Sequence, residues 1–279
     1  MRTIENQEAK IISTGASNVI GAKKVIEKAA RTCYHSIDKM TAESYEPFIQ
    51  RLIDAKHFSM LEHGTIYLRM PRMESLKRGH LYGSNPYSFC IVADHEPEYM
   101  YITTNYRVIV ENGWEDDLEY ISEYVEGKHE ERITFHLLTN IQVANEFVRH
   151  RVFSFAQEST RFCKYNSDKF NKELTFIVPH EMKNYGPYDK NNNKTLIIWT
   201  NAMIKAEEYY FELADAGCSA QECAQVLPKA TKTELIMTGT IPQWKQFIDI
   251  RYNESTGPVH PQAKELARLI NEKLCQHID

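Results

Sequence analysis

The chain has 279 residues with 42% hydrophobic and 25% charged side chains, a composition that can bury a sizeable core. Its net charge of −5 argues against a nucleic-acid-binding protein, because such proteins usually carry a basic surplus that neutralises phosphate. No apolar run approaches the ~20 residues of a membrane-spanning helix, so the composition also argues against a membrane protein.

Cysteine usage and the amino-terminal sequence indicate the cellular compartment in which the protein is expected. The six cysteines contain no CxxC pair and no metal-ligand spacing, which is typical of free thiols in a reducing compartment. Residues 1–10 lack the apolar stretch of a signal peptide. We therefore expect a cytoplasmic protein without a metal site.

In the first half of the chain, apolar spacing and turn residues predict helices, strands and one irregular stretch. Asn18 is a candidate helix cap. The predicted elements are, in order, helices over 18–33 and 42–55, a strand over 65–70, an irregular stretch over 71–98, a strand over 99–110 and an exposed acidic helix over 115–126.

The second half alternates strands and helices in the same manner. The predicted elements are a strand over 133–138, a helix over 139–149, a strand over 174–178, a polar loop through 191–193, a helix over 196–216 that stops at Gly217, a strand over 234–237, a helix over 243–251 and a final helix from 260. No repeat or linker divides these elements. The simplest organisation is one α+β domain over 1–279, with a mixed or antiparallel sheet flanked by helices.

The segment 149–161 (RHRVFSFAQESTR) carries most of the functional information. Arginine has a planar fork of donors that matches phosphate or carboxylate oxygens two at a time, so several arginines in one segment indicate an anionic ligand. A solvated basic surface is the ordinary alternative. Phe153, Phe155 and Phe162 alternate with polar residues, which favours a pocket wall.

This segment resembles the signature of the flavin-dependent thymidylate synthases, which is RHR, seven residues and then SxR. Members make thymidylate (dTMP) from deoxyuridylate (dUMP). They take a one-carbon unit from 5,10-methylenetetrahydrofolate and a hydride from FAD, which NADPH keeps reduced. The resemblance implies a methyltransferase that binds FAD, with NADPH and the folate as co-substrates. It also implies a homotetramer with active sites shared between chains.

The resemblance assigns roles to residues of the motif. Arg149, His150 and Arg151 would hold FAD, with Arg149 also near the nucleotide. Arg161 and the Ser159 hydroxyl would donate to the dUMP phosphate. The full set implied for dUMP is Glu146, Arg149, Gln157, Glu158, Ser159, Thr160, Arg161 and Arg251; Gln157 and Gln246 are implied as further flavin contacts.

A second segment, His57 to His63 (HFSMLEH), contains two histidines and a glutamate that invite a metal interpretation. The two histidines are six positions apart and so do not share one helical face, and polar groups satisfied around a loop are the simpler reading. The segment also resembles the family's His-x-Ser/Thr-x-x-Glu-His element. By that resemblance Ser59 contacts FAD, and His57 and Glu62 support the site.

A third segment, residues 227–251, predicts a strand, a turn and a helix that ends in a cation. An arginine there can simply complement the helix dipole. The run also resembles the family's LPxATxT…TGxxxxWxxFxxxR segment, whose arginine corresponds to Arg251. A guanidinium beside the pyrimidine would stabilise negative charge developing on the ring, which makes Arg251 the candidate catalytic residue.

Several positions depart from the family pattern. Ala224 stands where an arginine is usual, and Glu146 stands where a glutamine is usual; a carboxylate near a phosphate is unfavourable unless a cation offsets it. Thr240 and Pro242 replace an Asn and an Arg that many members place against the flavin.

Two further features of the chain bear on the same resemblance. The long separation between the second segment and the RHR motif predicts an insertion over about 70–131. No G-x-G-x-x-G turn and no cysteine motif of the classical thymidylate synthases is present, so the resemblance implies direct hydride transfer without a cysteine nucleophile.

Two other functions remain compatible with the sequence. One is a relative that binds FAD and nucleotide but lacks synthase activity, through the changes at Ala224 and Glu146. The other is a single-stranded nucleic-acid-binding module that uses the arginines and interleaved aromatic residues as a stacking platform. The acidic net charge argues against the second.

Overall fold

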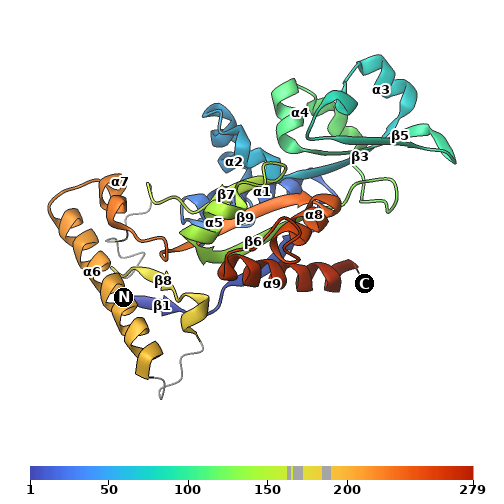
Figure 1. Ribbon diagram of the computed structural model, residues 1–279. Coiled ribbons are helices and arrows are strands. Elements are labelled where there is room, and N and C mark those ends of the chain that lie inside the picture. Colours follow the sequence, from blue (N-terminus) through green and yellow to red (C-terminus); the bar gives the residue numbers. More distant parts are fainter. Residues whose placement is uncertain (162–164, 166–171, 184–189, 279) are drawn as a thin grey trace.

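Figure 1 shows the computed structural model of the chain, which describes residues 1–161, 165, 172–183 and 190–278. A four-stranded antiparallel sheet lies at its centre, in the order β2-β6-β9-β7. Its strands are β2 (Glu8–Ser13), β6 (Arg132–Asn140), β9 (Lys232–Thr240) and β7 (Ser154–Gln157). The α+β class predicted from the sequence is confirmed.

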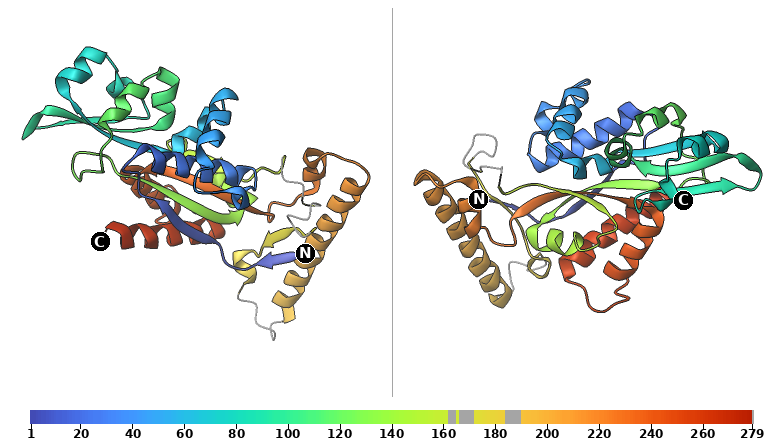
Figure 2. Two further views of the ribbon diagram at one scale, coloured as in Figure 1. Left: turned by 180° about the vertical axis from the view of Figure 1, so that it is seen from behind. Right: turned by 90° about the horizontal axis from the view of Figure 1, so that it is seen from above.

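The central sheet is covered by helices on both faces because its inner strands alternate in side-chain direction. Ile133, Phe135 and Leu137 of β6 face α5 (Ile141–Phe147), α8 (Ile241–Arg251) and α9 (Pro261–Ile278) in the largest apolar core. On the other face, Ile236 of β9 packs with Ala29 of α1 (Val19–Cys33). Figures 1 and 2 show α9 on one side of this sheet and α1 on the other.

A second sheet adjoins the first and holds most of the 70–131 region. Its order is β3-β5-β4, all antiparallel. The elements are β3 (Thr65–Pro71), α3 (Arg72–Arg78), β4 (Phe89–Ala93), β5 (Glu96–Asn105) and α4 (Tyr106–Asn112). Its apolar core is shared with α1 and with α2 (Tyr45–Asp54), so the region packs against the main body through a common core.

A smaller unit forms the opposite end of the molecule from the second sheet (Figure 2). It pairs β1 (Arg2–Ile4) in parallel with β8 (Thr175–Ile177) and includes α6 (Lys190–Asp215) and α7 (Ala220–Cys223). Leu174, Phe176 and Tyr210 are buried in its core.

Many predicted elements are confirmed, and local signals explain why. Helix α1 begins after Asn18, whose side chain accepts a hydrogen bond from the amide of Gly21 as a helix cap does. The predicted strands over 65–70, 133–138, 174–178 and 234–237 are β3, β6, β8 and β9, and the predicted helices over 139–149, 243–251 and from 260 are α5, α8 and α9.

Other predictions were wrong. The strand predicted over 99–110 ends at Asn105, whose side chain accepts from the amide of Val108 and starts α4. The stretch predicted as irregular contains α3, β4 and the start of β5, and the loop predicted at 191–193 lies within α6. Apolar spacing missed these elements because tertiary packing outweighs weak local propensity.

The acidic helix predicted over 115–126 is a shorter 3₁₀ helix, Glu115–Tyr120, and it is not wholly exposed. Asp117 is 0% exposed. Its carboxylate accepts from Arg78 at 2.9 Å and from the Tyr82 hydroxyl at 2.8 Å, and it contacts Nδ1 of His80 at 2.7 Å. Burial beside this carboxylate raises the pKa of Tyr82. Asp117 therefore ties α3 and the following turn to the 3₁₀ helix.

Candidate active site

Arg251 lies at the end of α8, and the core fixes that helix. Trp244 of α8 donates its indole N–H to the carbonyl of Ile133 at 3.1 Å, and Phe247 packs edge to face on Phe147. Because α8 is anchored on both β6 and α5, its last residue faces the end of α5, where the RHR motif starts.

Arg251 contacts two of the predicted site residues. Its Nε donates to Nε2 of His150 at 2.8 Å, Nη1 donates to the Glu146 carboxylate at 3.3 Å, and Nη2 donates to the Glu146 carbonyl at 3.1 Å. We call Glu146, His150 and Arg251 the Arg251 cluster. The predicted repulsion between Glu146 and an anionic ligand is offset here by a cation, because Arg251 pairs with that carboxylate.

The electrostatics of the Arg251 cluster favour a neutral imidazole. Burial and the adjacent Arg251 charge lower the pKa of His150 to about 4. A neutral His150 can accept the Arg251 hydrogen bond at Nε2 and so orient the guanidinium. Arg149 and Arg151 on either side of it are exposed, and neither side chain has a hydrogen-bond partner within the described part of the chain. Two fixed cations are therefore available to a ligand.

A second group of predicted residues lines a pocket of about 360 Å³ at the carboxyl-terminal end of the 149–161 motif. We call it the Ser59 pocket. It brings Ser59 and His57 of the second segment together with Gln157, Ser159 and Arg161 of the first. The Ser159 hydroxyl accepts from the amide of Arg161 at 3.2 Å, and Nε of Arg161 donates to Gln221 at 3.3 Å. The second segment and the SxR end of the motif, which are distant in sequence, therefore share one pocket.

Strand β7 separates the two ends of the motif. Arg151 precedes the strand and Ser159 follows it. A strand rises about 3.3 Å per residue, so the two ends lie on the order of 15 Å apart along β7. A ligand that contacts both ends within one chain must be extended, as a dinucleotide is.

Besides Arg149 and Arg151, three predicted site residues lie outside the Arg251 cluster and the Ser59 pocket. Glu158 is buried, and its carboxylate accepts from Lys232 at 3.0 Å and lies 3.4 Å from His35. Gln246 is exposed on α8, and Thr160 lies half-buried in the loop after β7. Phe162 lies outside the described residues.

His35, Glu158 and Glu234 form a cluster that the sequence did not suggest. Their side-chain ligand atoms lie within 4.8 Å of one another, close enough to hold a metal ion. Lys232 already contacts both carboxylates and supplies a positive charge there. The absence of a metal site stays a prediction.

The remaining residues of the second segment join the two sheets. Glu62 accepts from Arg107 at 2.6 Å and from the Ser154 hydroxyl at 2.7 Å. Nδ1 of His63 lies 2.8 Å from Oγ1 of Thr238 on β9. Sequence reasoning missed Arg107 and Ser154, because no spacing signal links α4 to β7.

His63 is expected to make folding stability depend on pH. Burial and the nearby Arg132 charge lower its pKa to about 3, and the side chain is 1% exposed. Between pH 6.5 and 3 the unfolded chain binds a proton there that the folded chain does not, so stability falls as pH drops. We expect protonation at His63 in the unfolded chain to lower the free energy of unfolding by about 2–3 kcal/mol between pH 7 and 4.5.

Urea unfolding of His63→Asn and the wild type at both pH values measures this contribution. The wild type should lose more stability than His63→Asn by that amount. His95→Asn changes an exposed histidine and should retain the wild-type fall. An identical fall in wild type and His63→Asn would contradict the assignment.

The fold and the site together define an α+β protein with an arginine-rich motif at the edge of an antiparallel sheet. The model of the thymidylate synthase complementing protein family matches residues 100–278. The chain therefore belongs to this family, whose curated members are named flavin-dependent thymidylate synthases. The family expected from the RHR motif is confirmed.

Individual relatives match parts of the chain. The flavin-dependent thymidylate synthases of Thermococcus onnurineus and Pyrococcus furiosus are 29% identical over 109 residues and 30% over 111. Each alignment covers 39% of this chain, and the chain spans 40% and 41% of these relatives. The enzyme of Mycolicibacterium gilvum is 23% identical over 251 residues, which cover 84% of this chain and 69% of that one.

Among solved structures, the chain is similar to a UMP/dUMP methylase, PolB from Streptomyces cacaoi, bound with 5-Br UMP. The identity is 16% and the TM-score is 0.48, with 99% of this chain and 92% of that chain covered. Within the described residues, no helix combines the length and apolarity needed to cross a membrane.

Proposed function

We propose that the chain is a flavin-dependent thymidylate synthase that methylates dUMP to dTMP, with 5,10-methylenetetrahydrofolate as one-carbon donor and NADPH as reductant of FAD. The observation that carries this proposal is the Ser59 pocket, where Ser59, Ser159 and Arg161 meet. These residues come from two segments that resemble different parts of the family signature. Their convergence on one pocket is expected if both segments serve one ligand site.

The residues present fit FAD. Arg149 and Arg151 are exposed cations without side-chain partners in the described chain, and such arginines suit a pyrophosphate. Ser59 and Gln157 offer further donors in the Ser59 pocket. FAD, when bound, supplies the hydride chemistry, and the protein supplies position and charge. Gln246 is the remaining proposed flavin contact.

Arg161, Ser159 and their neighbours would hold dUMP. Arg161 and the Ser159 hydroxyl are donors suited to its phosphate, with Thr160 beside them. Glu158 would act on dUMP indirectly, by supporting the loop that follows β7, since its carboxylate already pairs with Lys232. Glu146 would position Arg251 rather than approach the phosphate.

Arg251 is the proposed catalytic residue. Its guanidinium is held by Glu146 and by the neutral His150, so its direction is fixed before substrate arrives. Because Arg251 and Arg161 lie at opposite ends of β7, Arg251 would reach the pyrimidine of a dUMP whose phosphate is held by Arg161 of a neighbouring chain in the proposed tetramer. A fixed cation there stabilises charge that develops on the ring, without reorganisation during the reaction.

A cysteine nucleophile is not part of the proposal. Cys33 lines the Ser59 pocket, but burial raises the pKa of its thiol to about 11. The thiol is then protonated at neutral pH and is a poor nucleophile.

We also propose a homotetramer with shared active sites. Val152, next to Arg151, is 57% exposed, and α6 exposes Ile198 and Tyr209 by 60% and 55%. Exposed apolar groups beside a site and along a helix are typical of surfaces that associate. A monomer in sedimentation measurements would contradict this assembly.

Arg161→Ala tests the phosphate assignment. Loss of a charge-assisted hydrogen bond should weaken dUMP binding by about 2–3 kcal/mol, or roughly 30–150-fold. Isothermal titration of the flavin-loaded protein with dUMP measures this. Arg151→Ala is the matched control, because it should weaken FAD binding and change dUMP affinity little. A dUMP dissociation constant that is unchanged in Arg161→Ala would remove Arg161 from the phosphate site.

A further inference from the structure

A chain of hydrogen bonds connects the 70–131 region with the strand that follows the RHR motif. Arg107, the second residue of α4, donates from Nη1 to Oε1 of Glu62 at 2.6 Å. The other oxygen of that carboxylate, Oε2, accepts from the Ser154 hydroxyl of β7 at 2.7 Å. Glu62 itself belongs to the 3₁₀ helix Phe58–His63. One carboxylate therefore joins three elements that are distant in sequence.

Arg107 is held in place by its own helix. Its Nε and Nη2 donate to the two carboxylate oxygens of Glu111, one turn further along α4, at 2.7 and 3.0 Å. Its guanidinium carbon also lies 5.9 Å from the centre of the Tyr87 ring. The remaining nitrogen, Nη1, is thereby directed at Glu62. Lysine cannot make both carboxylate contacts in this geometry, because it lacks the planar fork of donors.

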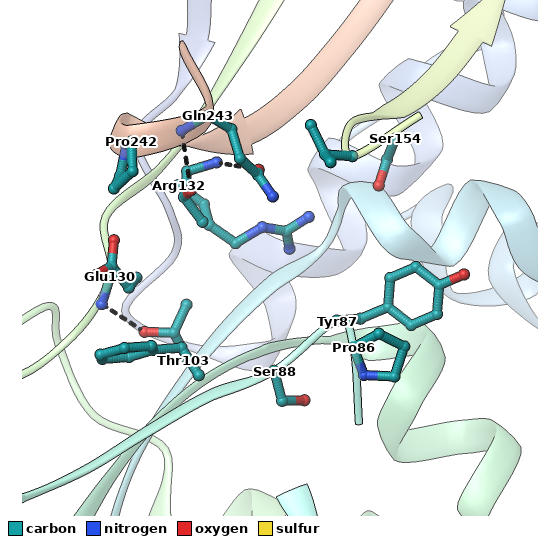
Figure 3. Close-up of a pocket in the computed structure, with 12 residues that line it drawn as sticks. Pro86, Tyr87, Ser88, Thr103, Glu130, Arg132, Ser154, Pro242 and Gln243 are labelled. Atoms are coloured by element: carbon teal, nitrogen blue, oxygen red, sulfur yellow. Dashed lines mark hydrogen bonds between the residues drawn. The ribbon is translucent and has the colours of Figure 1, made fainter. Parts of the chain in front are cut away.

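The elements that Glu62 connects carry proposed ligand contacts. The 3₁₀ helix of Glu62 also carries Ser59, which lines the Ser59 pocket. Ser154 is three positions after Arg151, and it lines a pocket at the junction of the two sheets together with Tyr87 of the 70–131 region (Figure 3). Three residues of extended chain span at most about 10 Å, so a hydrogen bond at Ser154 limits how far the RHR end of the motif can move.

The Glu62 carboxylate depends on Arg107 for its counter-charge. The Glu62 side chain is only 12% exposed, and a carboxylate shielded from water is costly without a cation. Arg132 donates to the backbone carbonyl of Glu62 at 3.2 Å, whereas the ion pair that the carboxylate forms within the described chain is with Arg107. Without Arg107 the carboxylate would turn toward water, and its hydrogen bond with Ser154 would weaken.

We propose that Arg107 is a positioning residue of the active site. It acts through Glu62, which holds the 3₁₀ helix that carries Ser59 against the start of β7. This inference rests on the proposed function, in which Ser59 and Arg151 contact FAD. Arg107 itself touches no ligand in this account. The proposal gives the 70–131 region a role, because that region supplies the counter-charge of Glu62.

Hydrogen exchange of the full chain without FAD tests the link between Arg107 and β7. In Arg107→Ala the amides of residues 154–157 should exchange roughly tenfold faster, since β7 is an edge strand that loses a charge-assisted hydrogen bond at its start. Arg69→Ala is the matched control, because Arg69 is a partly exposed arginine whose partners Tyr101 and Glu96 lie within the second sheet. Unchanged exchange in Arg107→Ala, or equal acceleration in Arg69→Ala, would overturn the proposal.

Titration with FAD, followed by flavin fluorescence, tests whether this link serves the site. Arg107→Ala should weaken FAD binding roughly five- to tenfold, and Arg107→Lys should recover part of the loss because lysine keeps the charge. In a Glu62→Ala background, Arg107→Ala should cause a further loss of less than about twofold, since the two residues act as one unit. An equal loss in both backgrounds would show that Arg107 does not act through Glu62 and would overturn the proposal.

The two measurements separate this proposal from the proposed function. A wild type that binds no FAD would contradict the proposed function, and the positioning role would fall with it. A wild type that binds FAD with an affinity that Arg107→Ala leaves unchanged would overturn the positioning role alone. Faster exchange in β7 together with weaker FAD binding, both absent in Arg69→Ala, is the result that the proposal expects.

Discussion

Arg251→Ala is expected to lower the rate of thymidylate formation by about 10²–10³-fold or more while FAD remains bound. This magnitude follows from the loss of one preorganised donor that stabilises charge in the transition state. FAD binding should persist because, among the proposed flavin contacts, only His150 touches Arg251, whereas Arg149, Arg151 and Ser59 are not contacts of Arg251. Turnover of the purified variant and the absorbance of its bound flavin give the two readouts.

Arg251→Lys refines this result. Lysine keeps the charge but lacks the planar fork that contacts Glu146 and His150 together, so we expect activity between those of Arg251→Ala and the wild type. The matched control is Arg268→Ala, which removes an exposed arginine from α9 and should leave the rate unchanged. Near-normal turnover in Arg251→Ala would exclude Arg251 from the chemistry.

Asp117→Ala should be the most destabilising single change in the 70–131 region. It leaves Arg78 and the Tyr82 hydroxyl without their buried acceptor, and breaking a buried ion pair on one side costs about 3–5 kcal/mol. The free energy of unfolding in urea measures this loss. Hydrogen exchange should show that protection is lost first in α3 and in the turn after it.

Glu119→Ala provides the comparison for Asp117→Ala. Glu119 also pairs with Arg78, but its side chain is 56% exposed, so its removal should cost at most about 1 kcal/mol. Equal losses of unfolding free energy in the two variants would show that burial does not set the strength of the hydrogen bonds around Arg78.

The sequence predicted the central sheet and its helices because their signals are local. Alternation along β6 and the cap at Asn18 are visible in short windows. It failed in the 70–131 region, where helix α3 and strand β4 are short and their apolar side chains are partly exposed. Asp117 was assigned to a surface helix because acidic runs usually form exposed helices. Its three partners come from residues 78–82, so no short window around Asp117 contains them.

The residues of the candidate site were predicted better than their arrangement. Motif resemblance named Ser59, Ser159 and Arg161, and the structure adds that they share one pocket. Sequence could not show that Arg251 contacts Glu146, because this pairing depends on how α8 packs on α5. No feature of the sequence indicated that Arg132 is buried, since a single arginine at the start of a strand is usually exposed.

The most direct test of the proposed function is an anaerobic single turnover. The protein is loaded with FAD and reduced, dUMP and 5,10-methylenetetrahydrofolate are added, and flavin absorbance and dTMP are followed together. We predict that the flavin is reoxidised with an equal amount of dTMP formed. Bound flavin that stays reduced, with no dTMP, would contradict the proposed synthase and leave a relative that only binds flavin and nucleotide.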